Sequence, residues 1–129
     1  MSWIYDSNVY IHHLNGQLGE TGAALRRAGL LRGGAYSAIS RIDVLGFPQP
    51  DQQLAMAEAL FARLMPIPVD ESVIAETIRL RCTRRIKIPD ALIAASALTR
   101  ALPLVTHHLA DFRAIDGLEL IDPERHGTP

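Results

Sequence analysis

The chain has 129 residues, 48% of them hydrophobic, so its length and apolar content favour one domain built around a single core. Its formal net charge of −1 excludes the bulk basicity of a protein that coats nucleic acid non-specifically, so any contact with nucleic acid has to be local. The single cysteine, Cys82, excludes an internal disulfide and a cysteine-based zinc knuckle, and we expect it to be a small buried thiol.

Strand and helix patterns alternate along the chain, which favours an α/β domain with a mostly parallel sheet. The predicted strands cover residues 2–6, 35–39, 67–69, 104–106 and 118–121. The predicted helices cover residues 7–15, 17–31, 40–46 with a cap at Ser40, 52–64, 70–84 and 90–100, followed by a short turn or helix at 107–112. For the helix at 70–84, the predicted inner side consists of Val73, Ile74, Thr77, Ile78 and Leu80 to Cys82.

The stretch from Arg84 to His108 carries the clearest pattern of turn, helix and strand. Pro89 suits the first turn of a helix, so Asp90 stands at the start of a helix that runs to about Arg100. That helix is apolar on almost every face, which predicts that it is buried. The β-branched run at 104–106 then predicts a strand inside a parallel sheet, placed to lie beside the Asp90 carboxylate.

Four aspartates fall near the end of a predicted strand or the start of a predicted helix: Asp6, Asp43, Asp90 and Asp111. Such junctions share one edge of a parallel sheet, so we expect the four carboxylates to lie close together. Oxygen ligands without a cysteine partner suit Mg²⁺ or Mn²⁺ rather than zinc, and a cation would offset their mutual repulsion. Taken alone, Asp6 or Ser7 is more typical of a plain helix cap.

A run of cations precedes Asp90 and consists of Arg79, Arg81, Arg84, Arg85 and Lys87. Two explanations stay open. The cations can be favoured at a helix C-terminus by the helix dipole, on a solvated face, or they can form a local patch that holds phosphates beside the acids.

Two histidine pairs, His12-His13 and His107-His108, suggest a zinc site as an alternative. Adjacent residues on a helix point about 100° apart, so each pair offers at most one well-aimed ligand. Exposed or supporting histidines are therefore favoured over zinc ligands.

No basic region followed by an apolar run opens the chain, and no stretch approaches the ~20 apolar residues of a membrane span. A lone cysteine also suits a reducing compartment. We therefore expect a soluble, cytoplasmic protein.

Four segments of the chain resemble the motifs of the PIN domain family. They are IYDSNVYI at 4–11, SAISRIDVLG at 37–46, KIPDALIAA at 87–95, and LVT at 104–106 continuing through Asp111-Phe112 to Asp122-Pro123. No single motif is specific, but the four stand in the right order over nearly the whole chain. In size the chain is similar to the VapC-type ribonuclease toxins of prokaryotic toxin–antitoxin pairs.

The resemblance implies a three-layer α/β/α sandwich with a mostly parallel central sheet. It further implies an endoribonuclease that depends on Mg²⁺ or Mn²⁺, a partner antitoxin whose tail covers the site, and a homodimer. Apolar residues that could form a self-complementary patch are Ile11, Leu14, Leu30 and Leu31.

The resemblance also implies roles for particular residues. The metal-binding and catalytic acids would be Asp6, Asp43, Asp90 and Asp111, with Ser7 and Thr106 as polar support in the catalytic site. The chain departs from the family at two positions, because the second acid is usually Glu rather than Asp43, and the place of His108 is commonly Asn or Asp.

These departures keep a second function open, a PIN-fold module that binds RNA or a protein partner without turnover. A third, a phosphatase-like domain using Asp6, lacks the second aspartate two positions on, where Asn8 stands.

Overall fold

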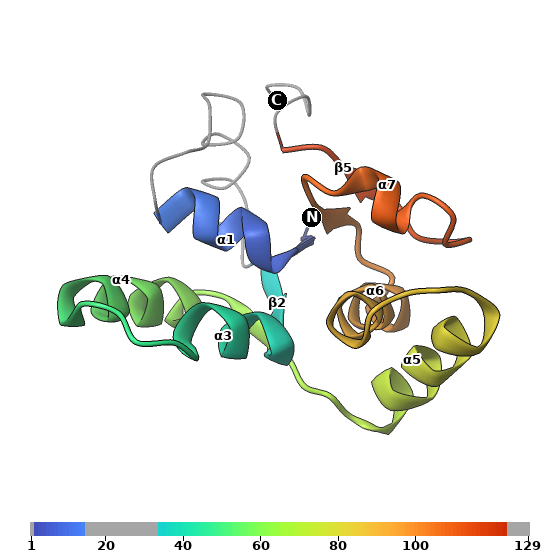
Figure 1. The fold of residues 1–129 in the computed structure, drawn as a ribbon, viewed down its shortest axis with the longest axis horizontal. Helices are drawn as coiled ribbons and strands as arrows, with labels where there is room; N and C mark the ends of the chain where they lie inside the picture. The colour runs from blue at the N-terminus through green and yellow to red at the C-terminus, as the bar shows by residue number, and fades with distance from the viewer. Residues whose placement is uncertain (1, 15–33, 124–129) are drawn as a thin grey trace.

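The computed structural model of the protein describes residues 2–14 and 34–123 and contains a parallel sheet flanked by helices (Figure 1). Its strands are β1 (Ile4–Tyr5), β2 (Ala35–Ser37), β3 (Met65–Ile67), β4 (Leu104–Val105) and β5 (Leu120–Ile121). They lie in the order β3-β2-β1-β4-β5, and each neighbouring pair is parallel. The predicted α/β fold with a parallel sheet is therefore confirmed.

The helices alternate with the strands along the chain. They are α1 (Ser7–Leu14), α3 (Ala38–Leu45), α4 (Asp51–Ala62), α5 (Glu71–Thr83), α6 (Ile88–Arg100) and α7 (Leu109–Phe112). The helix predicted at 17–31 lies outside the described residues.

The two faces of the sheet carry separate cores, because successive side chains of a strand point to opposite faces. Ile4, Ala35 and Leu104 belong to a cluster with buried residues of α5, α6 and α7. Tyr5, Tyr36 and Val105 belong to a second cluster with residues of α1, α3 and α4. Figure 1 shows α3 and α4 on one side of β2, and α5 and α6 on the other. The result is the three-layer arrangement that the sequence predicts.

The strand order reverses between β1 and β4. From β1 the chain adds β2 and β3 on one side, whereas β4 and β5 lie on the other. The crevice beyond the carboxyl ends of two such strands is where ligands bind in open α/β sheets. The residues that follow β1 and β4 therefore occupy the position in this fold best suited to a functional site.

Two predicted boundaries around β2 and β3 are wrong by a few residues. Strand β2 ends at Ser37, whose hydroxyl accepts a hydrogen bond of 3.3 Å from the Ile39 N–H and caps α3, so the cap is not Ser40. Strand β3 begins at Met65 with Pro66 inside it, which the edge of a sheet tolerates because one row of its N–H groups needs no partner.

The buried stripe of α5 is narrower than predicted. Val73, Thr77 and Leu80 are buried, at the spacing of one helical face. Ile74 and Ile78 are 39% and 58% exposed, and Cys82 is exposed as well. The expectation of a buried thiol was therefore wrong, since the apolar character of these positions does not fix which side of the helix meets α6.

No helix among residues 2–14 and 34–123 is long and apolar enough to cross a membrane. Of the residues suggested for a dimer patch, Ile11 packs against the core and is partly buried. Leu30 and Leu31 lie outside the described residues, so the homodimer stays a prediction.

The stripe on α5 gives a test of the packing. Leu80 is fully buried against the α6 layer, so Leu80→Ala should lower the free energy of unfolding by about 2–5 kcal/mol. Ile78→Ala on the exposed face should change it by about 0.5 kcal/mol or less. Urea unfolding of both variants measures the difference, and equal losses would show that the two faces of α5 are assigned wrongly.

Candidate active site

The centre of the site is a buried carboxyl at the end of β1. Asp6 is only 4% exposed, and its backbone N–H donates to the Val105 carbonyl of the neighbouring strand β4 at 2.9 Å. Thr106, which follows β4, is fully buried, and its hydroxyl donates to Asp6 Oδ2 at 2.8 Å. The parallel register of β1 and β4 thus places two polar residues, 100 positions apart, in direct contact at the switch point.

Burial raises the pKa of the Asp6 carboxyl above its ordinary value of 3.8. Hydrogen bonds from the Thr106 hydroxyl and the Ser7 backbone N–H oppose part of that rise, because both stabilise the ionised form. The charge of Asp43 adds to the rise and that of His108 opposes it. The Asp6 carboxylate is therefore held in place by hydrogen-bond donors, but it has little contact with solvent and little positive charge nearby.

Asp43 approaches the same point from α3. It is exposed, and its Oδ2 lies 2.9 Å from the Ser7 hydroxyl, which donates to it. Ser7 Oγ also lies 3.1 Å from the buried hydroxyl of Ser40. A hydroxyl has only one proton, so Ser7 donates to the Asp43 carboxylate while it accepts from Ser40. This contact joins the first turn of α1 to α3 and positions Asp43.

Asp90 stands in the first turn of α6, as predicted, and is partly buried. That burial raises its pKa above 3.8, and the negative charges of Asp6 and Asp111 add to the rise. His108 and Lys87 oppose it. The electrostatic coupling shows that Asp6, Asp90 and Asp111 share one region.

Asp111 lies in α7 at the exposed rim and is positioned through His108. The Asp111 Oδ2 is 3.5 Å from His108 Nδ1, and both side chains are about half exposed, at 58% and 49%. His108 Nε2 lies 3.1 Å from the side-chain nitrogen of Asn8, and its backbone N–H donates to the Thr106 hydroxyl at 2.9 Å. The imidazole therefore bridges the start of α1 and α7.

The sequence did not indicate the partners of these acids. The contacts of Asn8 with His108 and of Ser7 with Ser40 join residues 100 and 33 positions apart, and no local pattern marks them. His108 contacts Asn8 and Asp111, and the preference for supporting histidines over zinc ligands stays a prediction. The side chains of His12 and His13 lie outside the described part of the chain.

The donor set has the chemistry of a divalent-cation site, with carboxylate oxygens and two pKa values raised by burial and by neighbouring charge. Within the described residues, however, no three Asp, Glu, His or Cys side chains are gathered closely enough to hold an ion as they stand. Asp43 and Asp111 are exposed at the rim, whereas Asp6 is buried.

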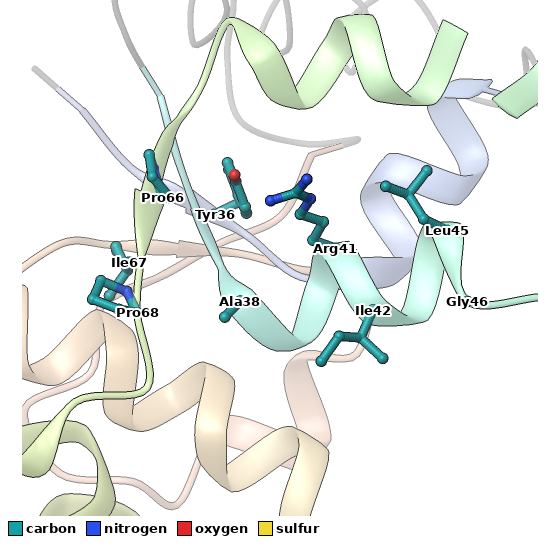
Figure 2. Close-up of a pocket in the computed structure, with 9 residues that line it drawn as sticks. All are labelled: Tyr36, Ala38, Arg41, Ile42, Leu45, Gly46, Pro66, Ile67 and Pro68. Carbon is teal, nitrogen blue, oxygen red and sulfur yellow. The ribbon is translucent and has the colours of Figure 1, made fainter. Parts of the chain in front are cut away.

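An apolar hollow of about 570 Å³ lies along α3, the helix that also carries Asp43. Its walls include Ile42 and Leu45 of α3, opposite Pro66, Ile67 and Pro68 from β3 and the segment after it (Figure 2). Figure 2 also shows the Arg41 guanidinium reaching toward Tyr36 inside this hollow. It offers mainly apolar surface and one cation, in contrast to the acidic site.

A parallel sheet with a buried aspartate at its switch point and three more aspartates around it defines an α/β domain with an acidic site at the carboxyl edge. The chain belongs to the PIN domain family, whose model matches residues 4–118.

Relatives and solved structures agree with this assignment. Over 90 residues the chain is 37% identical to Ribonuclease VapC5 of Mycobacterium tuberculosis; the match spans 64% of this chain and 65% of that relative. The fold is similar to DNA-bound VapBC from Salmonella typhimurium, with a TM-score of 0.81, 22% identity and coverage of 95% of this chain and 98% of that one. For FitAcB from Neisseria gonorrhoeae the TM-score is 0.72, the identity 26% and the coverage again 95% and 98%.

The raised pKa of Asp90 predicts how stability depends on pH. The folded state holds this proton more tightly than the unfolded state, so metal-free protein should lose stability as pH rises from 3.8 toward the raised pKa. Above that pH the loss is constant. Asp90→Asn should remove this contribution and raise the melting temperature at pH 7, with no gain at pH 3.

Thermal unfolding of both proteins in chelator across this range measures the difference, with exposed Asp116→Asn as the matched control. An Asp90→Asn variant no more stable than wild type at pH 7 would contradict the electrostatic strain assigned to this acid.

Proposed function

We propose that this protein is an endoribonuclease that depends on Mg²⁺ or Mn²⁺ and is the toxin of a toxin–antitoxin pair. The observation that carries the proposal is the buried Asp6 carboxyl at the switch point, coupled electrostatically to Asp43 and Asp90. Membership of the PIN domain family and the 37% identity to a protein named a ribonuclease support the activity.

In this proposal the four aspartates hold the cation. Asp6 is the fixed ligand, because the Thr106 hydroxyl and two strand ends determine its position. Ser7 orients Asp43, and His108 orients Asp111. A cation bound there would lower the pKa of its bound water and would stabilise negative charge on a phosphoryl oxygen under attack.

The departure at Asp43 fits this arrangement. A side chain one methylene shorter than Glu reaches less far, and the Ser7 contact holds it toward α1, on the side where Asp6 stands. Asp43 then binds the cation directly or through a water, as Mg²⁺ sites with several retained waters commonly do.

Purified protein should cut single-stranded RNA with added Mg²⁺ or Mn²⁺ and stop when a chelator is added. Asp90→Asn should lower the rate by about 100-fold or more, because several kcal/mol of charge stabilisation is lost. The control Asp116→Asn changes an exposed aspartate that is not one of the four site acids, so this variant should cut at the wild-type rate. Gel analysis of labelled RNA measures all three.

The second candidate, a module that binds without turnover, predicts a different result. RNA affinity would fall steeply with salt, and no cleavage would appear with any divalent ion. The Asp43 and His108 departures are the observations that favour it. Cleavage that the chelator abolishes would exclude it.

The partner in this proposal is an antitoxin protein, which is supported by the similar fold of a toxin–antitoxin complex from Klebsiella pneumoniae, with a TM-score of 0.75. We assign its docking segment to the apolar hollow of Figure 2, because the exposed Ile42 side chain leaves unpartnered apolar surface beside Asp43. The cation of Arg41 in the hollow suits an acidic residue in that segment.

Ile42→Asp should therefore weaken binding of the proposed antitoxin by about tenfold or more, since a charged group would replace apolar contact surface. Ile78→Asp is the control, because Ile78 is similarly exposed, at 58% against 63%, but lies on α5. Titration of purified proteins measures both affinities. Equal effects of the two substitutions would place the antitoxin elsewhere.

A further inference from the structure

A second hollow, of about 760 Å³, lies at the turn between α5 and α6 and is lined by cations. Its cationic side chains are Arg81, Arg84, Arg85 and Lys87, and Ile86 and Ile88 are among its apolar walls. We call this group the basic hollow. It contains four of the chain's 13 Lys and Arg residues within seven positions, although the chain as a whole carries a net charge of −1.

In the described part of the chain, the cations of the basic hollow form no ion pair. No Asp or Glu stands between Glu76 and Asp90 in the sequence. Within the described residues, no ion pair joins any of the four to a carboxylate. By contrast, Arg79 pairs with Glu76 on the same helix. The run of five cations therefore divides into Arg79, which forms an ion pair, and four that form none among the described residues.

The helix dipole accounts for only part of these cations. It favours a cation in the last turn of α5, where Arg81 lies, but α5 ends at Thr83. Arg85 and Lys87 follow that end, and Lys87 is the N-cap of α6, where the positive end of the dipole disfavours a cation. Four like charges therefore lie close together, one of them at an unfavourable helix start, and an anion would relieve their repulsion.

The turn that carries the basic hollow is held in place. The Arg84 guanidinium donates to the Ala114 carbonyl at 2.8 Å, which ties the turn to the segment after α7. Arg81, Arg85 and Lys87 are exposed, so their charged groups can reach a ligand. The arrangement is a fixed turn with three accessible cations.

The basic hollow adjoins the acidic site through the first turn of α6. Only Ile88 and Pro89 separate Lys87 from Asp90, and the charge of Lys87 acts on the Asp90 carboxyl. A strand of RNA whose phosphodiester lies at the acids would continue over this turn, with its next phosphates beside guanidinium and ammonium groups. Ile86 and Ile88 offer apolar contact to its sugars and bases.

We propose that the basic hollow binds the phosphates of the RNA strand on one side of the bond that is cut. The proposal rests on the proposed function for the identity of the ligand. It assigns to this chain a substrate-binding surface outside the acidic site, and its affinity should be electrostatic and insensitive to base sequence.

The test measures binding without cleavage. A fluorescent oligouridine is titrated with protein carrying Asp90→Asn in chelator, and anisotropy is followed at several salt concentrations. In that background, Arg85→Gln with Lys87→Gln should weaken binding by about tenfold or more, and each single substitution should have a smaller effect. Loss of two phosphate contacts should also reduce the slope of log affinity against log salt by about 1.4.

The control is Arg63→Gln, which removes an exposed cation at the end of α4 outside the basic hollow and should leave affinity unchanged. Arg84 is kept in every variant because it anchors the turn. Thermal unfolding checks that each variant is folded, and the single substitutions provide the measurement if the double variant is not.

Unchanged affinity and salt slope in the folded double variant would overturn the proposal. So would a result in which the double variant loses affinity for an oligoglutamate peptide but not for oligouridine, because the hollow would then serve an acidic protein segment. The nuclease proposal is tested separately. If the protein never cuts RNA but its variants lose oligouridine binding, the proposal for the basic hollow stands and the proposal of nuclease activity is wrong.

Discussion

The rest of the site depends on the burial of the Asp6 carboxyl between the ends of β1 and β4. A carboxylate removed from water is costly unless donors or a cation compensate it. The Thr106 hydroxyl and the Ser7 N–H provide part of that compensation, and both are supplied by the strand ends and the first turn of α1. The part of the cost that is not compensated raises the pKa of the Asp6 carboxyl. A positive charge bound near this carboxyl would therefore be stabilised.

The other acids are arranged around Asp6 by contacts between helices. Ser7 links α1 to Asp43 on α3, and His108 links Asn8 on α1 to Asp111 on α7. The start of α1 therefore contributes to both sides of the site, while α6 contributes Asp90 directly. Asp43, Asp90 and Asp111 are each carried by a different helix. The packing of both helical layers on the sheet therefore determines the distances between their carboxylates and that of Asp6.

The sequence predicts the structural features that depend on local residue patterns and on the connection rules of parallel sheets. The order of elements, the position of Asp6 after β1 and that of Asp90 in the first turn of α6 follow from periodicity, Pro89 and strand ends. Asn8 and Ser40 were missed as supports because their contacts depend on tertiary packing. The exposure of Cys82 and of the outer face of α5 was predicted wrongly for a related reason. Periodicity shows which residues share one face of a helix, but not which element packs against that face.

The acidic site and the basic hollow are two unfavourable charge clusters on either side of one helix start. In the isolated protein, aspartates repel one another beside Asp6, and cations that form no ion pair among the described residues gather near Lys87, the N-cap of α6. Neither arrangement helps the chain to fold, and local rules broken without a compensating gain are expected at functional sites. A divalent cation would relieve the first cluster and phosphate groups the second. An RNA strand with a metal ion would carry both charges in the required order, so a single ligand of this kind would account for both departures from electrostatic balance.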